Sequence, residues 1–351
     1  MTTSNNSKMV GVQLYQMPQF YLILVVMGLI VVFSSSSFWM SWFGLELMTL
    51  FFLPFLSSTK SWVTSVQCWQ YLVVQVSGST ILMLLVLFPL QVGVMSFSPF
   101  PSSSSLYSTL LSLPLVFKMA MPPFQSWVLN LSDLVSWLPF YVLNGLQKLG
   151  PLCLLYSMSS FDLHSSLTFV LILSSCMCLF GILDNSLRRV LVYSSILNLS
   201  WSLFLIHTDV PTSFAFVLVY LLILGCFLYI LFSFNTYTIV SLYAITSTRS
   251  APIQVATVLG FISVFGLPPF VGFQLKLESL LKISVSQAGL TWPSFLLLSS
   301  SLLMVVMYLH ILHLSFLNKP SHKLRDSLVS PKVSILYTMT LLLSSANLLM
   351  V

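Results

Sequence analysis

The chain has 351 residues, of which 57% are hydrophobic and only 6% are Asp, Glu, Lys or Arg. Soluble domains carry about 25% of these charged residues, so the composition excludes a water-soluble enzyme. The net charge of +6 comes from sparse basic residues scattered along the sequence, which excludes a nucleic-acid-binding surface. A membrane protein remains, and the length suffices for about eleven spanning helices of roughly 20 residues with short loops.

Stretches of high hydropathy predict the membrane spans in chain order. The first six lie near residues 19–34, 38–56, 66–88, 106–122, 134–158 and 166–183. Five more lie near residues 190–206, 213–234, 253–283, 292–316 and 333–351. The ninth span is long enough to be broken or bent. We therefore expect an all-α polytopic transmembrane helix bundle that forms a single integral membrane domain over residues 1–351, with a polar segment at 1–18 and the bundle at 19–351.

The distribution of positive charge predicts how this bundle is oriented. With eleven spans, the side of the N-terminus holds most of the basic residues: Lys8, Lys60, Arg188, Arg189, Arg249, Lys319, Lys323, Arg325 and Lys332. The opposite side holds Lys282 and the turns with Asp162, His164, His207 and Asp209. The N-terminus is therefore expected on the side of the negatively charged compartment, either the cytoplasm or the mitochondrial matrix.

The sequence offers little for a nucleotide or metal site. It contains no GxGxxG, GxxxxGK[ST] or GxSxG pattern. The cysteines lie in apolar runs, and we interpret them as small buried hydrophobic residues: Cys68, Cys153, Cys176, Cys178 and Cys226. His310 and His313 lie three residues apart in the tenth span, but two ligands alone do not make a metal site. We expect no bound metal.

Four ionisable residues lie within predicted spans rather than in loops: Glu46, Lys118, Lys148 and Lys276. A charge that faces lipid costs about 2.5–3.5 kcal/mol on insertion scales, so these side chains should face the bundle interior, one another or water. Three lysines cannot all pair with one carboxylate, so part of the lysine charge must be held by water or backbone carbonyls, or be lost with its proton. These residues are our candidates for proton translocation. The alternative is that they only hold helices together.

Two helix breaks give a second, independent indication. Pro122 and Pro123 precede Phe124 shortly after Lys118, and Pro268 and Pro269 precede Phe270 shortly before Lys276. Proline removes a backbone donor and frees carbonyls, which at membrane depth are tolerated only beside protein or a water-filled cavity. The corresponding breaks suggest an internal repeat, and paired interruptions indicate a transport site.

Five segments in order carry a family resemblance: Phe38–Leu47, Lys118–Trp127, Leu146–Pro151, Asn185–Ile196 and Gly266–Phe273. Together they closely resemble the mitochondrial NADH-ubiquinone oxidoreductase chain 2 family, antiporter-like subunits in the membrane arm of respiratory complex I. The resemblance implies an antiporter-like bundle with two proline-broken helices and an inverted repeat. It also implies a subunit of a proton-translocating NADH:ubiquinone reductase that has no redox site of its own, since NADH, FMN, iron-sulfur clusters and ubiquinone belong to other subunits.

The resemblance also implies roles for single residues. Glu46 matches the family's membrane carboxylate, and Lys118 matches the lysine that partners it. Lys148 matches the lysine on the central polar axis, and Lys276 matches the lysine beyond the second broken helix. The implied partners are other membrane-arm subunits in a hetero-oligomer, with lipids such as cardiolipin. The implied location is the mitochondrial inner membrane, with the N-terminus on the matrix side.

The chain departs from the family's pattern at three places. Residues 66–71 are uncharged where animal relatives usually carry Glu and Lys, so we expect that surface charge to be dispensable or compensated in this chain. Gln125 stands where a histidine is common, and Asn130 where a glutamate is common.

Two alternative functions stay open: a stand-alone cation/proton antiporter, and a structural spacer of the membrane arm that does not conduct protons.

Overall fold

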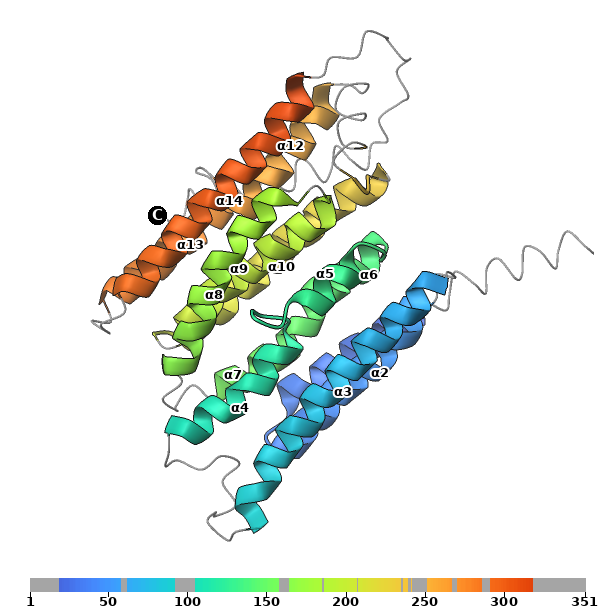
Figure 1. Cartoon of the computed structure of the whole chain (residues 1–351), viewed down its shortest axis with the longest axis vertical. Coiled ribbons are helices and arrows are strands. Elements are labelled where there is room, and N and C mark those ends of the chain that lie inside the picture. Colours follow the sequence, from blue (N-terminus) through green and yellow to red (C-terminus); the bar gives the residue numbers. More distant parts are fainter. Residues whose placement is uncertain are drawn as a thin grey trace, which may run out of the picture. The chain divides into compact units, whose positions relative to one another are not determined.

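The computed structural model describes residues 19–57, 62–91, 105–157, 164–184, 186–206, 208–234, 236–238, 241, 251–266, 270–285 and 291–317. All regular secondary structure in these ranges is helical, as predicted (Figure 1). The chain divides into two compact units, Met1–Ser166 and Leu167–Val351. The predicted polar segment at 1–18 and the predicted last span at 333–351 lie outside the described residues.

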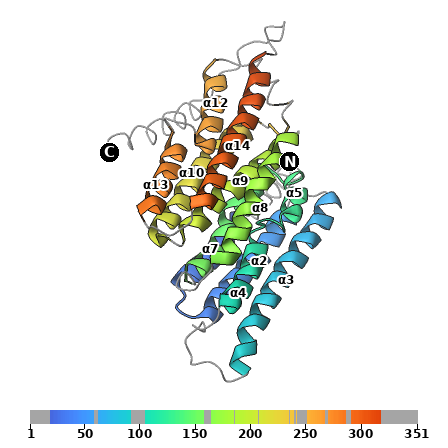
Figure 2. The ribbon, with the colours of Figure 1, turned by 60° about the vertical axis from the view of Figure 1, so that its left-hand side comes forward.

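The described part of the first unit is a series of helices. They are Gln19–Ser34, α2 (Phe38–Ser57), α3 (Trp62–Gln91), α4 (Ser105–Lys118), α5 (Ser126–Ser132), α6 (Trp137–Tyr141), the π-helical turn η1 (Val142–Leu146) and α7 (Gln147–Ser157). Helix α3 packs against α2, α4 and α5, and α7 packs against α2 and α4. In Figures 1 and 2, α2 and α3 run side by side. This packing brings α2, α3, α4 and α7 together around one interior.

The second unit is built around α9. Its helices are α8 (His164–Leu183, which begins just before the boundary), α9 (Leu187–Leu205), α10 (Val210–Ser233), α12 (Ala251–Phe265), α13 (Val271–Val285) and α14 (Thr291–Leu317). Every residue of α9 except Arg189 is buried, and α9 packs against α10, α13 and α14. A helix that is buried all round belongs to the core of its unit.

The outer surface of the helices is apolar. Within the described residues, three helical stretches are long and apolar enough to cross a membrane: Phe38–Ser57, Val66–Leu87 and Val210–Ser233. Shorter apolar helices accompany them at Gln19–Ser34, Thr109–Lys118, Thr168–Gly181 and Pro293–Val306. Large side chains such as Trp69, Leu84 and Phe295 are exposed, which suits contact with lipid or other apolar helices rather than water. The chain is an integral membrane protein.

The predicted spans from 19–34 to 292–316 each coincide with described helices, with differences in detail. The span predicted to end at 122 ends as α4 at Lys118, because the chain leaves the helix before the proline pair. The span predicted at 134–158 is α6, η1 and α7 rather than one regular helix. The interpretation of all cysteines as buried was wrong, since Cys176 is exposed and Cys68, Cys153 and Cys226 are partly exposed.

Candidate functional site

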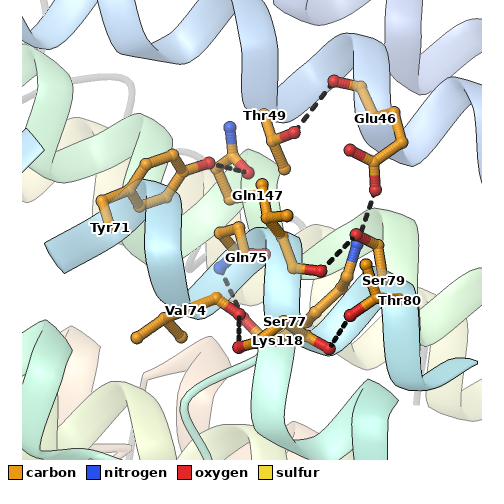
Figure 3. A network of polar contacts seen from close by, with 11 residues as sticks. Glu46, Thr49, Tyr71, Val74, Gln75, Ser77, Ser79, Thr80, Lys118 and Gln147 are labelled. Carbon is orange, nitrogen blue, oxygen red and sulfur yellow. Dashed lines mark hydrogen bonds and ion pairs between the residues drawn. The ribbon is translucent and has the colours of Figure 1, made fainter. Parts of the chain in front are cut away.

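The centre of the candidate site is an ion pair between α2 and α4. Lys118 Nζ lies 3.4 Å from Glu46 Oε1, with side-chain exposures of 2% for the lysine and 18% for the glutamate. In Figure 3, Glu46 points from its helix toward the lysine. Lys118 is the last residue of α4, where the helix dipole favours a positive charge. The expected pairing of intramembrane charges is therefore present at this site.

The first helix break lies directly after Lys118. Residues 119–125 form turns before α5 begins at Ser126, and Ala120 adopts a φ of 56°. The Lys118 carbonyl, which the break leaves without a helical donor, accepts a hydrogen bond from Gln75 Nε2 at 3.2 Å. The interruption predicted at Pro122 and Pro123 is therefore present, and α3 satisfies the backbone that it exposes.

The second break shares one backbone feature with the first, a residue with a positive φ. Helix α12 ends at Phe265, and Gly266 adopts a φ of 70° before α13 begins at Val271. Gly266 and Ala120 each stand two residues before a proline pair in the sequence. Pro268 and Pro269 themselves lie outside the described residues. The shared left-handed residue supports the predicted internal repeat.

Lys148 is 3% exposed and lies in α7, directly after the π-helical turn η1. A π-helical turn leaves helical backbone groups out of their usual pairing and is frequent at functional sites. The preceding residue, Gln147, contacts two other helices: its Oε1 accepts a hydrogen bond from Tyr71 Oη at 3.0 Å, and its Nε2 donates to the Met48 carbonyl at 3.2 Å. Figure 3 shows the Tyr71 hydroxyl directed at the Gln147 amide.

Lys276 belongs to the second unit, where it is 8% exposed in α13. Its carbonyl accepts a hydrogen bond from the buried Ser279 hydroxyl at 2.6 Å. The structure thus brings Glu46 and Lys118 into contact, buries Lys148 in the same unit, and buries Lys276 in the other.

The exposed charges of the second unit include one that sequence reasoning overlooked. The count of four ionisable residues within spans omitted Glu278, which lies exposed on α13 two residues after Lys276. Lys282 Nζ, one turn further along α13, lies 3.2 Å from Asp209 Oδ2 just before α10. Lys282 and Asp209 therefore lie at the same end of this unit, as the predicted topology requires.

Among the described residues, no group of three or more His, Cys, Asp or Glu side chains could hold a metal ion. The side chains of His310 and His313 lie outside that description.

Curated relatives, rather than a family model, show which family this chain belongs to. No family model matches the chain. The NADH-ubiquinone oxidoreductase chain 2 of Sylvisorex johnstoni is 30% identical over 259 residues, covering 73% of this chain and 73% of the relative. That of Rhynchonycteris naso is 30% identical over 263 residues, or 72% of each. The chain belongs to the NADH-ubiquinone oxidoreductase chain 2 family. A more distant member, from Osphranter robustus, is 26% identical over 304 residues and extends the match to 86% of each chain.

Solved structures share the fold of this chain 2 family member. A chain of respiratory complex I from Thermus thermophilus with bound Aureothin superimposes with a TM-score of 0.76 at 18% identity, covering 95% of this chain and 78% of that one. A chain of the membrane-bound sulfane sulfur reductase, an archaeal respiratory membrane complex, gives 0.76 at 16% identity over 93% and 72%. A chain of the Mrp complex from Dietzia sp. gives 0.71 at 18% identity over 86% and 61%. The predicted fold class is confirmed.

Sequence reasoning missed the polar residues of α3 in this chain 2 family member. Gln67, Tyr71, Gln75 and Ser79 are all buried, although they belong to a helix whose other side chains are mostly apolar. The run 66–71 was expected at the surface, and this placement was wrong for Gln67 and Tyr71, which are buried. The available signal was the spacing of four residues, which places side chains on one helical face.

Proposed function

We propose that the chain is a core membrane-arm subunit of a proton-pumping NADH:ubiquinone oxidoreductase, respiratory complex I. The observation that carries this proposal is the ion pair of the buried Lys118 with the partly buried Glu46 at a helix break, in a member of the chain 2 family. A structural scaffold has no need of a buried pair, since apolar side chains of similar volume stabilise an interior at least as well.

In the proposed mechanism, protons move through a half-channel and along the axis Glu46, Lys118, Lys148, Lys276. When Glu46 is ionised and close, it stabilises the protonated form of Lys118. When the two charges separate, the ammonium loses that stabilisation, and its proton moves on toward Lys148. Each helix break, which the sequence marks with Pro122 and Pro123 or with Pro268 and Pro269, interrupts the helix next to a lysine, and we propose that water reaches the lysines there.

Moving one elementary charge across the membrane requires about 2.3 kcal/mol per 100 mV, so proton transfer needs an external source of energy. We propose that redox chemistry in partner subunits, with their NADH, FMN, iron-sulfur clusters and ubiquinone, supplies it. The chain then contributes to the enzyme as a proton-translocating subunit and binds none of these cofactors itself.

We further propose that both units form one membrane domain in the mitochondrial inner membrane, with the N-terminus on the matrix side. Lys8 and Lys60 on that side, and the Asp209 turn on the other, support this orientation through the positive-inside rule. The partners are other membrane-arm subunits in a hetero-oligomer, with lipids such as cardiolipin at the apolar surface.

A native gel tests the assignment. Native membranes are solubilised in a mild detergent, the complexes are separated, and each band is probed for this chain and for NADH-dependent dye reduction. We expect the chain in a large band that has this activity. Migration alone, while an active complex runs elsewhere, would contradict the assignment and favour a stand-alone cation/proton antiporter.

A further inference from the structure

Helix α3 carries a row of buried polar side chains on one face, here called the α3 polar row: Gln67, Tyr71, Gln75 and Ser79. The residues recur every four positions, so they lie one above another along the helix. The first three each reach a different element of the first unit. Gln67 Nε2 donates a hydrogen bond to the Asn130 carbonyl of α5 at 3.0 Å. Tyr71 bonds to α7, and Gln75 bonds to the end of α4. The row therefore ties α3 to both sides of the first helix break and to the helix that carries Lys148.

Tyr71 reaches the Lys148 segment through the side chain of Gln147. Its hydroxyl donates to Gln147 Oε1, and the Gln147 amide nitrogen donates to the Met48 carbonyl of α2. An amide rotated by half a turn would bring its oxygen against that carbonyl, so the two bonds together select one orientation. Gln147 adjoins Lys148, and Met48 lies two residues after Glu46. The amide thus links the backbone near the carboxylate to the backbone near the second lysine.

Gln75 acts on Lys118 through that residue's own carbonyl. Its amide donates to the Lys118 oxygen at 3.2 Å, where α4 stops. Beside it on α3, Gly78 has no side chain, and a Cβ there would lie 2.9 Å from Lys118 Cγ. The surface of α3 is therefore shaped to receive the lysine stem and to hold its backbone at the break.

We infer that Tyr71 and Gln75 are positioning residues of the proton path, Tyr71 orienting the Lys148 segment through Gln147 and Gln75 orienting Lys118 through its carbonyl. Buried polar side chains are costly unless fully bonded, and an apolar row would pack α3 as well. The polarity of Tyr71 and Gln75 serves the geometry of the two lysines. This inference rests on the proposed function of the chain.

The substitution Tyr71→Phe tests it in the assembled complex. The ring of Tyr71 is fully buried against Phe52 and Trp127, with centroids at 5.1 and 6.0 Å, and phenylalanine retains both contacts. Only the hydroxyl is lost. The matched control is Tyr308→Phe, which removes an equally buried hydroxyl that donates to the Val190 carbonyl at 3.1 Å in the second unit.

We expect both variants to assemble to the same level. Tyr71→Phe should lower NADH-driven proton pumping in reconstituted vesicles about fivefold, the equivalent of one lost hydrogen bond, and change the pH profile of pumping. Tyr308→Phe should leave the pumping rate and the pH profile unchanged. Equal behaviour of the two variants in both measurements would overturn the inference.

Two further variants keep the test independent of one substitution. Gln75→Met removes the bond to the Lys118 carbonyl at nearly constant length, and we expect a similar loss of pumping. Gln147→Leu combined with Tyr71→Phe should pump no worse than Gln147→Leu alone, because Tyr71 acts through Gln147. Additive losses would contradict the linkage. Lys118→Met separates the two claims: unchanged pumping in that variant would contradict the proposed function itself, whereas unchanged pumping in Tyr71→Phe and Gln75→Met alone would contradict the positioning roles.

Discussion

The two helix breaks use the same left-handed backbone with different residues, and this difference can be tested. Gly266 has a φ of 70° and Ala120 a φ of 56°. A Cβ added to Gly266 would lie 2.6 Å from the carbonyl carbon and oxygen of Gly272, which are backbone atoms that cannot rotate away. Gly266→Ala therefore introduces both backbone strain and a steric clash.

The magnitudes follow from these two effects. A residue with a side chain in the left-handed region costs roughly 1–2 kcal/mol. Overpacking by one methyl group against a fixed neighbour adds about 1–3 kcal/mol. We therefore expect Gly266→Ala to lower the free energy of unfolding by about 2–5 kcal/mol. Ala120→Gly relieves strain of the first kind but adds freedom to the unfolded chain, so its net effect should stay within about 1 kcal/mol.

The assay is thermal. Membranes carrying each variant are heated, and the fraction of the chain that remains in the intact complex is measured on native gels. Gly266→Ala should lower the midpoint by about 5 °C or more, with Ala120→Gly close to the unaltered chain. A Gly266→Ala midpoint equal to that of the unaltered chain, or an equally large loss in Ala120→Gly, would refute the reasoning.

Three further sets of substitutions test single contacts. Gly78→Ala would place a Cβ 2.9 Å from Lys118 Cγ, so we expect the lysine to shift and pumping in vesicles to fall severalfold. Glu46→Gln leaves the buried Lys118 ammonium without its carboxylate, and we expect a loss of about 3 kcal/mol in thermal unfolding that adding Lys118→Met largely restores. Lys282→Met removes a largely exposed ion pair with Asp209, so unfolding should change by less than about 0.5 kcal/mol. Normal pumping in Gly78→Ala would contradict the contact of α3 with Lys118. Additive losses in the Glu46→Gln, Lys118→Met double variant would contradict the ion pair. A loss of several kcal/mol in Lys282→Met would contradict the minor role of its pair with Asp209.

The bundle and its ion pair follow from strong physical constraints, and they could therefore be predicted. Hydropathy placed spans near 38–56 and 213–234, where the structure has α2 and α10, because a membrane requires long apolar helices. Some pairing of intramembrane charges could be anticipated because isolated charges in hydrocarbon are costly, whereas the particular contact of Glu46 with Lys118 was implied by the family resemblance. The proline pairs likewise marked both breaks.

Features that depend on packing between helices could not be read in the same way. The end of α4 at Lys118 is stabilised by Gln75 from another helix, and no local pattern contains that contact. The π-helical turn η1 contains Asn144 and Gly145, which favour an irregular helix but do not by themselves specify a π-helical turn. The burial of Tyr71 depends on which face of α3 meets α7, whereas a hydropathy window averages over all faces.

The most direct test of the central claim is the number of protons pumped per NADH oxidised by complexes that carry Lys118→Met. The matched control is Lys282→Met, which removes a lysine that lies outside the buried pair. Our account predicts a sharply lower ratio for Lys118→Met, with assembly largely preserved, and an unchanged ratio for the control. An unchanged ratio for Lys118→Met would contradict the claim that this lysine carries protons.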